Sequence, residues 1–396
     1  MDRRVTSIFS ILILLAAAGC GGNSTSRVPS TPPGVSVAAA KYLYVANSAD
    51  ATVSGFSILP TGELQPVPGV NAATSLSTPT ALAVSSSGKV YVGSSTSKNV
   101  ITFSADIATG RLSNPVPLPF DLLHNNFTWS NAATLATCGT HLFAFGEGFG
   151  PAPGGGTESI GFSGFAYSLN SDGSINPIDW SGFGTFDSLP IVSNGFIDSS
   201  CRYVFHANTA ANMAEQTTID TAAHSMHAYP GSAAGIAPVW VAADPNLKFL
   251  YVANSGSNNV SAFSIHVDSG VLTPIVGSPF SAGAQPSSVI VAGDWVYVSN
   301  SGDNTVSAFT WNQTSGELTP VAGSPFQVGT NPAVFMTAET DLSHSPTGKL
   351  LYVANQNSNN VSGFVIESNG ALRPVAHSPF TVGSGPKGMA VLVGPQ

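Results

Sequence analysis

Four stretches of the chain alternate apolar and polar residues in the same order, each with a polar segment in the middle. The clearest copy, LYVANSGSNNVSAFSI, covers residues 250–265, and close copies cover residues 43–58, 296–309 and 351–364. On both sides of a segment rich in Asn, Ser and Gly, β-branched and aromatic residues recur at every second position. This alternation is typical of strands, and Asn and Gly favour tight turns. Each copy therefore predicts two antiparallel strands and their connection.

Two further apolar segments follow each regular copy. The first is VLTPIVGSPF at residues 271–280, with relatives at 317–326 and 371–380. Its prolines cannot donate ladder hydrogen bonds, so this third strand of the unit is expected at a sheet edge. The second is an apolar run that begins after another proline and leads into the next copy. Four strands in a unit of about 50 residues are typical of a β-propeller blade.

An aromatic residue marks the same position of each unit and allows the units to be counted. Five copies are clear, and two degenerate ones, LFAFG and YVFHAN, fill the interval between them. The markers are Tyr44, Tyr91, Phe143, Phe205, Tyr251, Tyr297 and Tyr352. The first unit lacks its leading strand, while the chain ends with one spare apolar run, GPKGMAVLVGPQ. We therefore predict an all-β propeller of seven four-stranded antiparallel blades, closed by the last strand joining the first blade.

The repeated phrases carry a family resemblance. YVAN and YVSN, each followed by an Asn/Ser/Gly turn and a V-S-x-F strand, resemble the YVTN-type repeats of bacterial and archaeal surface propellers. From about Lys41 onward, the chain is similar to the seven-bladed lactonase-like propellers, which include 6-phosphogluconolactonase-like and muconate-cyclising members. The resemblance implies the fold for residues 41–396. For activity it implies a lactone hydrolase, although the phrases that carry it are scaffold.

Composition narrows the possible partners. Charged residues make up 8% of the chain, the formal net charge is −9, and Lys and Arg total 12. Proteins that bind nucleic acid need clustered cations against the phosphates, and the sequence has no such cluster. We therefore expect no nucleic-acid partner. We also expect a monomer without a cofactor.

The first 40 residues differ from the rest. Arg3 and Arg4 precede an apolar run at residues 8–18, and small residues then lead to Cys20. This resembles a bacterial lipoprotein signal, in which the cysteine becomes the lipidated first residue; the alternative is an ordinary secretory signal or a membrane anchor. Residues 21–40 have the composition of a flexible tether. We therefore expect a protein of the bacterial cell envelope, periplasmic or on the cell surface, attached to the membrane through its N-terminal lipid.

Extra sequence in the second to fourth units indicates where a site lies. The links between the second and third strands of a blade, and those between blades, lie on one face, which we call the mouth face. Four of these links are enlarged, at residues 121–129, 146–161, 181–190 and 208–216. They predict a catalytic pair, His124 and Glu147, and ligand-binding residues at Asn126, Trp129, Glu158, Asp187 and Glu215. Acidic groups, a histidine and an aromatic suit a polar small molecule or a sugar.

Cysteine and histidine residues give two further hypotheses. Cys138 and Cys201 both precede a second strand, in neighbouring blades, so a disulfide is possible in an oxidising compartment. Equivalent points on adjacent blades can also lie beyond the Cα separation of about 7 Å that a disulfide tolerates. His224 and His227 have a spacing seen at metal sites, but they align with outer strands away from the mouth. We therefore expect no metal site.

Two functions fit these patterns. The first is a non-catalytic propeller that binds an unknown small molecule, a glycan, a peptide or a protein at its mouth. The second is a lactone hydrolase, with a base such as His124 or Glu147 activating water. A phosphorylated substrate would require cations for charge-assisted hydrogen bonds. None of the arginines after the leader is expected at the mouth (Arg27, Arg111, Arg202 and Arg373), so the hydrolase would act on an uncharged or weakly charged lactone.

Overall fold

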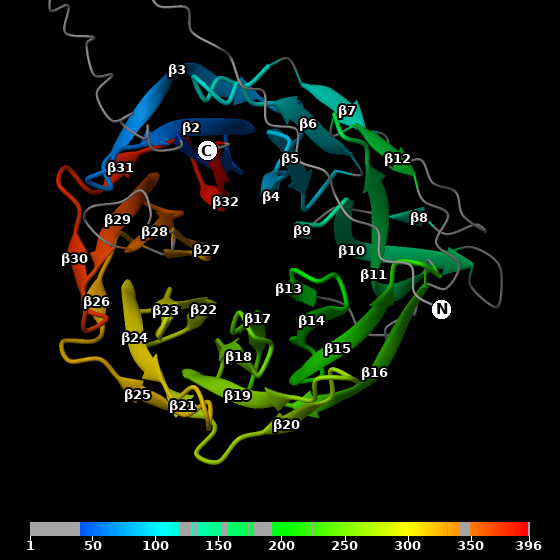
Figure 1. The fold of residues 1–396 in the computed structure, drawn as a ribbon, viewed down its shortest axis with the longest axis vertical. Coiled ribbons are helices and arrows are strands. Elements are labelled where there is room, and N and C mark those ends of the chain that lie inside the picture. Colours follow the sequence, from blue (N-terminus) through cyan, green and yellow to red (C-terminus); the bar gives the residue numbers. More distant parts are fainter. Residues whose placement is uncertain are drawn as a thin grey trace, which may run out of the picture. The chain divides into compact units, whose positions relative to one another are not determined.

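The computed structural model places antiparallel sheets in a ring around a common axis (Figure 1). The residues that it describes contain strands but no helix, and so no helix long and apolar enough to cross a membrane. They are residues 40–97, 99–113, 115–118, 128–129, 134–151, 157–172, 174–177, 192–223, 225–330, 332–339 and 349–394.

The first four blades each place their strands in order from the centre outward. Blade 1 contains β32 (Pro386–Val393), β1 (Lys41–Asn47), β2 (Thr52–Ile58) and β3 (Leu64–Ala73). Blade 2 contains β4 (Pro79–Val84), β5 (Lys89–Ser94), β6 (Val100–Ser104) and β7 (Val116–Leu118). Blade 3 contains β9 (Thr134–Cys138), β10 (His141–Pro151), β11 (Thr157–Leu169) and β12 (Ile175–Pro177), with β8 (Thr128–Trp129) beside β10. Blade 4 contains β13 (Val192–Ile197), β14 (Tyr203–Asn208), β15 (Met213–Asp220) and β16 (Ser225–Ala233).

The last three blades have a divided outer strand. Blade 5 contains β17 (Pro238–Ala243), β18 (Phe249–Asn254), β19 (Asn259–Ile265), β20 (Leu272–Pro274) and β21 (Phe280–Ser281). Blade 6 contains β22 (Pro286–Ala292), β23 (Trp295–Asn300), β24 (Thr305–Trp311), β25 (Leu318–Pro320) and β26 (Phe326–Gln327). Blade 7 contains β27 (Pro332–Glu339), β28 (Lys349–Asn355), β29 (Asn360–Ile366), β30 (Leu372–Pro374) and β31 (Phe380–Thr381).

The prediction of seven blades closed by the last strand is confirmed. In the first blade, β32 pairs with β1, with Ala390 opposite Tyr44 and Met389 opposite Val45. The proline-rich segment does lie at the outer edge, as predicted. It differs from the expected single strand because a turn divides it into two short pieces, such as β20 and β21, which pair with different parts of β19.

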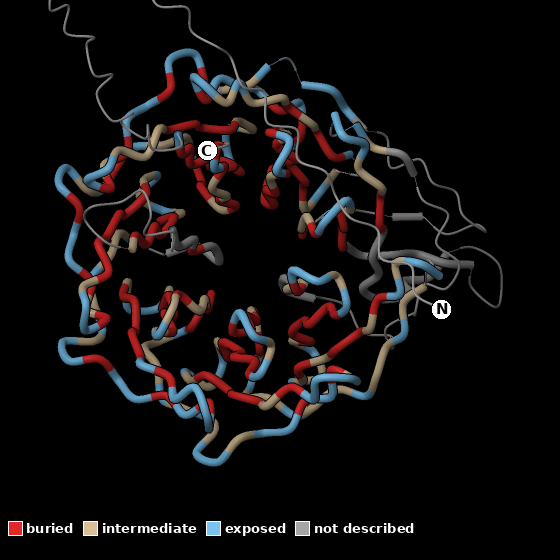
Figure 2. Tube along the Cα trace, viewed as in Figure 1, coloured by how far each residue is buried: buried red, intermediate tan, exposed pale blue. Residues whose placement is uncertain are grey.

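A hydrogen bond that recurs between neighbouring blades explains the buried tyrosine of the regular units. The side chain of Tyr251 is fully buried, and its hydroxyl donates a hydrogen bond to the carbonyl of Gly316 in the next blade. Burial raises the pKa of this phenol, so it remains a donor. The same bond recurs from Tyr44 to Gly110, from Tyr297 to Gly370 and, across the closure, from Tyr352 to Gly62. Figure 2 shows the buried residues mainly on the second and third strands of the blades, such as β18 and β19, and exposed residues along the outer edge.

The asparagine that ends each regular second strand serves the turn. Asn254 is fully buried, and its side-chain amide donates to the side chains of Asn259 and Ser261 on the third strand. Asn300 makes equivalent bonds to Thr305 and Ser307. These bonds pair the NH2 group of each buried side-chain amide within the blade, so we assign the repeated asparagines to the scaffold.

Candidate functional site

Blade 4 replaces two scaffold residues by ionisable ones. In blade 5, Val252 of the second strand lies opposite Ser261 of the third. In blade 4 the corresponding pair is His206 on β14 and Glu215 on β15. Function usually lies where a repeat departs from what its fold requires, so this pair is the first candidate for chemistry.

The replaced pair forms a tight, mostly buried contact. The distance between His206 Nε2 and Glu215 Oε2 is 2.7 Å, and the Asn208 side-chain amide donates to Glu215 Oε1 at 2.9 Å. The His206 side chain is 0% exposed, whereas that of Glu215 is 18% exposed. The Glu215 side chain therefore has partial contact with solvent, whereas that of His206 has none.

The position of the pair follows from the alternation of side chains along β14. Val204 packs against Phe143 and Phe145 of blade 3. Because alternate residues of a strand face the same side, His206 also faces blade 3. It is two residues from Asn208, which ends β14 at the mouth face. The pair thus lies at the mouth end of the contact between blades 3 and 4.

The environment of Glu215 keeps its carboxyl group ionised. Burial by itself would raise the pKa of Glu215, but the hydrogen bond and charge of His206, with the Asn208 amide, outweigh it and lower the pKa below its usual value. Hydrogen bonds to the charged form of an acid favour that form. At neutral pH, Glu215 is therefore ionised. Its carboxylate, positioned by His206 and Asn208, can accept hydrogen bonds or a proton.

The other predicted site residues are placed less completely. His124, Asn126 and Asp187 lie outside the described residues. Trp129 is in β8, opposite Gly148, and the backbones of Glu147 and Glu158 belong to β10 and β11, opposite Phe162 and Gly150. The predicted roles of these residues, including catalysis by His124 and Glu147, stay predictions.

Two of the enlarged links are not the loops that the sequence indicated. Residues 146–161 were expected to be one long loop, but β10 runs to Pro151 and β11 begins at Thr157. They continue as a hairpin beyond the regular strand length, and β8 adds to it. Residues 208–216 contain only a short turn, so Glu215 lies on a strand. For residues 146–161 the expectation was wrong because glycine-rich sequence usually weakens strands, whereas here backbone pairing continues through it.

Cations are scarce at the mouth face of the described residues. Arg111, Arg202 and Arg373 lie beside turns of the opposite face, as expected from the sequence. Among the Lys and Arg residues that the structure describes, Lys387, near the start of β32, lies at the mouth face. The described residues also contain no group of three or more His, Cys, Asp or Glu side chains that could hold a metal ion.

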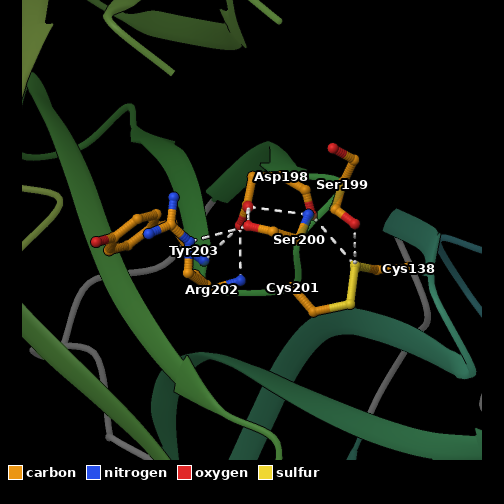
Figure 3. Close-up of a disulfide and its surroundings, with 7 residues drawn as sticks. All are labelled: Cys138, Asp198, Ser199, Ser200, Cys201, Arg202 and Tyr203. Carbon is orange, nitrogen blue, oxygen red and sulfur yellow. Dashed lines mark hydrogen bonds between the residues drawn. A yellow bond between two sulfur atoms is a disulfide. The ribbon is translucent and has the colours of Figure 1, made fainter. Parts of the chain in front are cut away.

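A disulfide joins blades 3 and 4 at the end opposite the pair. Cys138 ends β9 and Cys201 lies in the turn before β14, with a Cα–Cα distance of 5.7 Å, within the range that a disulfide needs (Figure 3). In blade 3, Phe143 occupies the position of the hydrogen-bonding tyrosines and has no hydroxyl. The disulfide therefore lies at a contact between blades that lacks this tyrosine bond.

Comparisons with known proteins agree with this architecture. The family model described as a seven-bladed β-propeller lactonase matches residues 197–336 and 275–389. No curated protein matches the sequence.

Three solved structures resemble the fold over most of the chain. A candidate 6-phosphogluconolactonase from Bacteroides uniformis has 20% identity and a TM-score of 0.68, covering 89% of this chain and 99% of its own. A second, from Bacteroides fragilis, has 19% identity and a TM-score of 0.69, covering 91% and 100%. A periplasmic gluconolactonase from Pseudomonas aeruginosa has 18% identity and a TM-score of 0.68, covering 90% and 100%. At these identities the likeness shows the fold, a seven-bladed β-propeller, and the family match over residues 197–389 supports a lactonase-like member of that fold.

Proposed function

We propose that the protein is a lactone hydrolase whose reaction takes place beside Glu215. The observation that carries this proposal is the His206–Glu215 pair, which stands where blade 5 has Val252 and Ser261. The family match to a lactonase model supports the same reaction class. Non-catalytic binding of a glycan, peptide or protein at the mouth is the competing hypothesis.

The pair can perform the base step of lactone hydrolysis. Glu215, ionised and partly exposed, takes a proton from a water molecule as that water attacks the lactone carbonyl carbon. The bond from this carbon to the ring oxygen then breaks, and the ring oxygen receives the proton back from Glu215, so one water adds, a hydroxy acid forms and the carboxylate is regenerated. His206 does not reach solvent; it is a positioning residue that orients the carboxylate. Because a carboxylate of low pKa is a weak base, we expect modest rates.

The substrate of this hydrolase is uncharged or weakly charged. Lys387 provides one positive charge at the described mouth face, whereas Arg111, Arg202 and Arg373 are at the opposite face. A phosphate group is usually bound by several charge-assisted hydrogen bonds. We therefore expect glucono-δ-lactone to be hydrolysed with a higher kcat/KM than its 6-phosphate.

Restoring the scaffold residues tests the proposal. The double variant His206→Val/Glu215→Ser gives blade 4 the residues of blade 5, and Asn208 can then bond to the new serine as Asn254 does to Ser261. Replacing a buried ionic pair by well-packed neutral residues is often neutral or stabilising, so this variant should fold. Its hydrolysis of glucono-δ-lactone should fall at least about 100-fold, the usual contribution of a general base. Undiminished turnover by a folded double variant would place the reaction elsewhere.

The same variants separate hydrolysis from binding. Glu215→Gln keeps a side chain of nearly the same shape but cannot accept the proton. A hydrolase should lose turnover and still bind the lactone. If the parent protein turns over no lactone but a glycan array detects binding that the double variant loses, the binding hypothesis replaces the hydrolase.

The location is a separate proposal that rests on the N-terminal sequence. Residues 1–20 resemble a lipoprotein signal and Cys20 is its lipidation position. We propose a lipid-anchored protein of the bacterial cell envelope, in which the propeller meets lactones outside the cytoplasm. Metabolic labelling with a palmitate analogue tests this directly, with Cys20→Ala as the unlabelled control.

A further inference from the structure

The outer strand of blade 4 is irregular directly beside Glu215. The pairing of β15 with β16 is regular on both sides of this residue, but Glu215 itself lies opposite two residues, Pro230 and Gly231. An extra residue on one strand of an antiparallel pair is a β-bulge, and bulges are frequent next to active sites, where they redirect a side chain. The bulge on β16 lies at the level of the proposed base.

The regular blades have no strand at the corresponding place. In blade 5 the outer strand is divided, and Ser261, the counterpart of Glu215, pairs with neither β20 nor β21. In blade 4 the outer strand β16 instead continues past Glu215 without a break. Blade 4 therefore departs from the repeat in its outer strand at the same level at which Glu215 replaces a serine.

A buried glutamine contacts the bulge. The side chain of Gln216 is 1% exposed, and its amide nitrogen donates a hydrogen bond to the carbonyl oxygen of Pro230 at 3.2 Å. The residues at this position are Ala262 in blade 5 and Ala308 in blade 6. Where the regular blades have only a methyl group, blade 4 has a long polar side chain that fixes the bulge.

Gly231 leaves space that the Glu215 side chain needs. A Cβ atom at Gly231 would lie 2.7 Å from Glu215 Cγ and 3.0 Å from the carbonyl oxygen of Ala214. It would also lie 3.2 Å from Cε of Met213, which ends a flexible side chain. Non-bonded carbon atoms approach to about 3.5–4.0 Å, so the contact with Glu215 is the most severe. The φ of Gly231 is not in the left-handed region, so glycine is needed here for space and not for backbone conformation.

The Glu215 side chain is confined between the two strands that flank β15. On one side, a methyl group at Gly231 would have to move Glu215 Cγ by about 1 Å to reach ordinary contact. On the other side, His206 is fully buried, and its Nε2 is already 2.7 Å from the carboxylate. Hydrogen bonds of this kind require about 2.7–3.2 Å between donor and acceptor. The carboxylate therefore cannot move by this amount and keep its bonds to both His206 and Asn208.

We infer that Gly231 is a positioning residue of the proposed base, because it leaves the space in which the Glu215 side chain reaches His206 and Asn208. Its effect on turnover rests on the proposed hydrolase function, whereas the confinement of Glu215 does not. Gly231 takes no part in the reaction itself. Glu215 is fixed from both sides, by hydrogen bonds from β14 and by the bulge on β16.

Adding one methyl group tests this role. Gly231→Ala should lower kcat for glucono-δ-lactone by about 100-fold, the loss that a misplacement of about 1 Å can cause, and leave KM nearly unchanged. Gly195→Ala is the matched control, because it adds a methyl group to β13 of the same blade, where the nearest atom, the carbonyl oxygen of Phe205, is 3.4 Å away. This control should keep the kcat of the parent protein. A Gly231→Ala protein that also keeps it overturns the inference.

A stability comparison shows whether the methyl group acts through Glu215. Gly231→Ala should lower Tm by about 1–4 °C in the parent protein. The fall should be much smaller in the variant His206→Val/Glu215→Ala, in which residue 215 has no Cγ. Making one change in two backgrounds isolates the contact between the two side chains. An equal fall in both backgrounds would assign the effect to the Ala214 carbonyl and overturn the inference.

A spectroscopic measurement keeps the inference testable without turnover. In protein with isotope-labelled histidine, the Nε2 signal of His206 reports its contact with Glu215, and loss of this signal in His206→Val/Glu215→Ser identifies it. Gly231→Ala should shift the signal in the same direction as Glu215→Gln. If it does so but the parent protein hydrolyses no lactone, the proposed function fails and the confinement of Glu215 stands. If the parent hydrolyses lactones and Gly231→Ala changes neither kcat nor the signal, the positioning role fails and the hydrolase stands.

Discussion

Removing the Cys138–Cys201 disulfide should lower the stability of the propeller measurably. The bond closes a loop with a sequence separation of 63 residues. In the chain-entropy model, a loop of this length restricts the unfolded chain by about 4 kcal/mol at 25 °C. Unfolding entropies of about 2.1 cal/mol/K per residue give a propeller of this size about 0.7 kcal/mol/K, so the expected fall in Tm is about 5 °C.

The double variant Cys138→Ala/Cys201→Ala makes this comparison without introducing a buried hydroxyl. Cys201 has a φ of 56°, in the left-handed region, which alanine also rarely adopts. However, Leu247 occupies the matching turn of blade 5 with a φ of 53°, so the scaffold accepts a non-glycine residue there. The substitution should therefore remove the bond without adding new backbone strain. Differential scanning calorimetry of the parent protein, oxidised and reduced, provides a second comparison of the propeller with and without the disulfide.

Hydrogen exchange then identifies the strands that lose stability when the disulfide is removed. Cys138 belongs to blade 3 and Cys201 to blade 4, so peptides from β9 and β14 should exchange faster in the variant than those from β18 and β23. The entropic argument is refuted if the oxidised, reduced and alanine forms melt within 1 °C of one another. Thiol titration of the denatured, unreduced parent supplies the control, because these two cysteines should not react.

Three further predictions concern the blade contacts, the site and the N-terminus. Tyr297→Phe leaves the buried carbonyl of Gly370 without its partner and should destabilise the protein by about 1–3 kcal/mol in chemical denaturation; an unchanged midpoint would show that water replaces the hydroxyl. Because the pKa of Glu215 is lowered in the folded state, its ionised form stabilises the protein above the ordinary glutamate pKa of about 4.3, and this contribution should be lost as the pH falls through the folded value; Glu215→Gln should therefore show a weaker loss of Tm between neutral and acidic pH than the parent. Cys20→Ala should release the protein from the membrane fraction, and retention after a carbonate wash would refute lipid anchoring.

The fold could be predicted from the sequence because the same pattern of strands and turns occurs in several units. Each copy presents the same alternation and the same turn residues, so a copy with a weak pattern can be interpreted by comparison with the others. The strand at residues 386–393 follows a complete seventh unit, and the first unit lacks its leading strand. Closure of the ring therefore predicts its pairing with the strand around Tyr44. The outer strand was less predictable, because the division between β20 and β21 depends on a turn that alternation does not reveal.

The candidate site was harder to predict because one of its two residues is a substitution within a strand of regular length and not part of an enlarged link. The enlarged links led to Glu215 but not to its partner. His206 stands in YVFHAN where other copies have the Val of YVAN. Aligning the copies residue by residue would have revealed it, since a histidine at a fully buried valine position needs a polar partner. That partner, Glu215, replaces the serine of the opposite strand.

The energetics of blade 4 support a functional reason for this pair. Burying two ionisable side chains costs desolvation that their mutual attraction often only offsets, and neutral residues of similar volume usually serve stability as well or better. Blade 5 shows such neutral residues at the same positions, Val252 and Ser261, in the same backbone geometry. The scaffold therefore does not need His206 and Glu215.

The contact that carries the pair is also fastened differently from its neighbours. Blades 1, 5, 6 and 7 each donate a buried tyrosine hydroxyl to the next blade, a non-covalent contact. Blade 3 has Phe143 instead, and its contact with blade 4 is covalent through Cys138 and Cys201. A covalent link at one end of this contact limits how far the two blades can separate at the other end. The carboxylate itself is held by His206 and Asn208 of its own blade, and a positioned base requires such a fixed geometry.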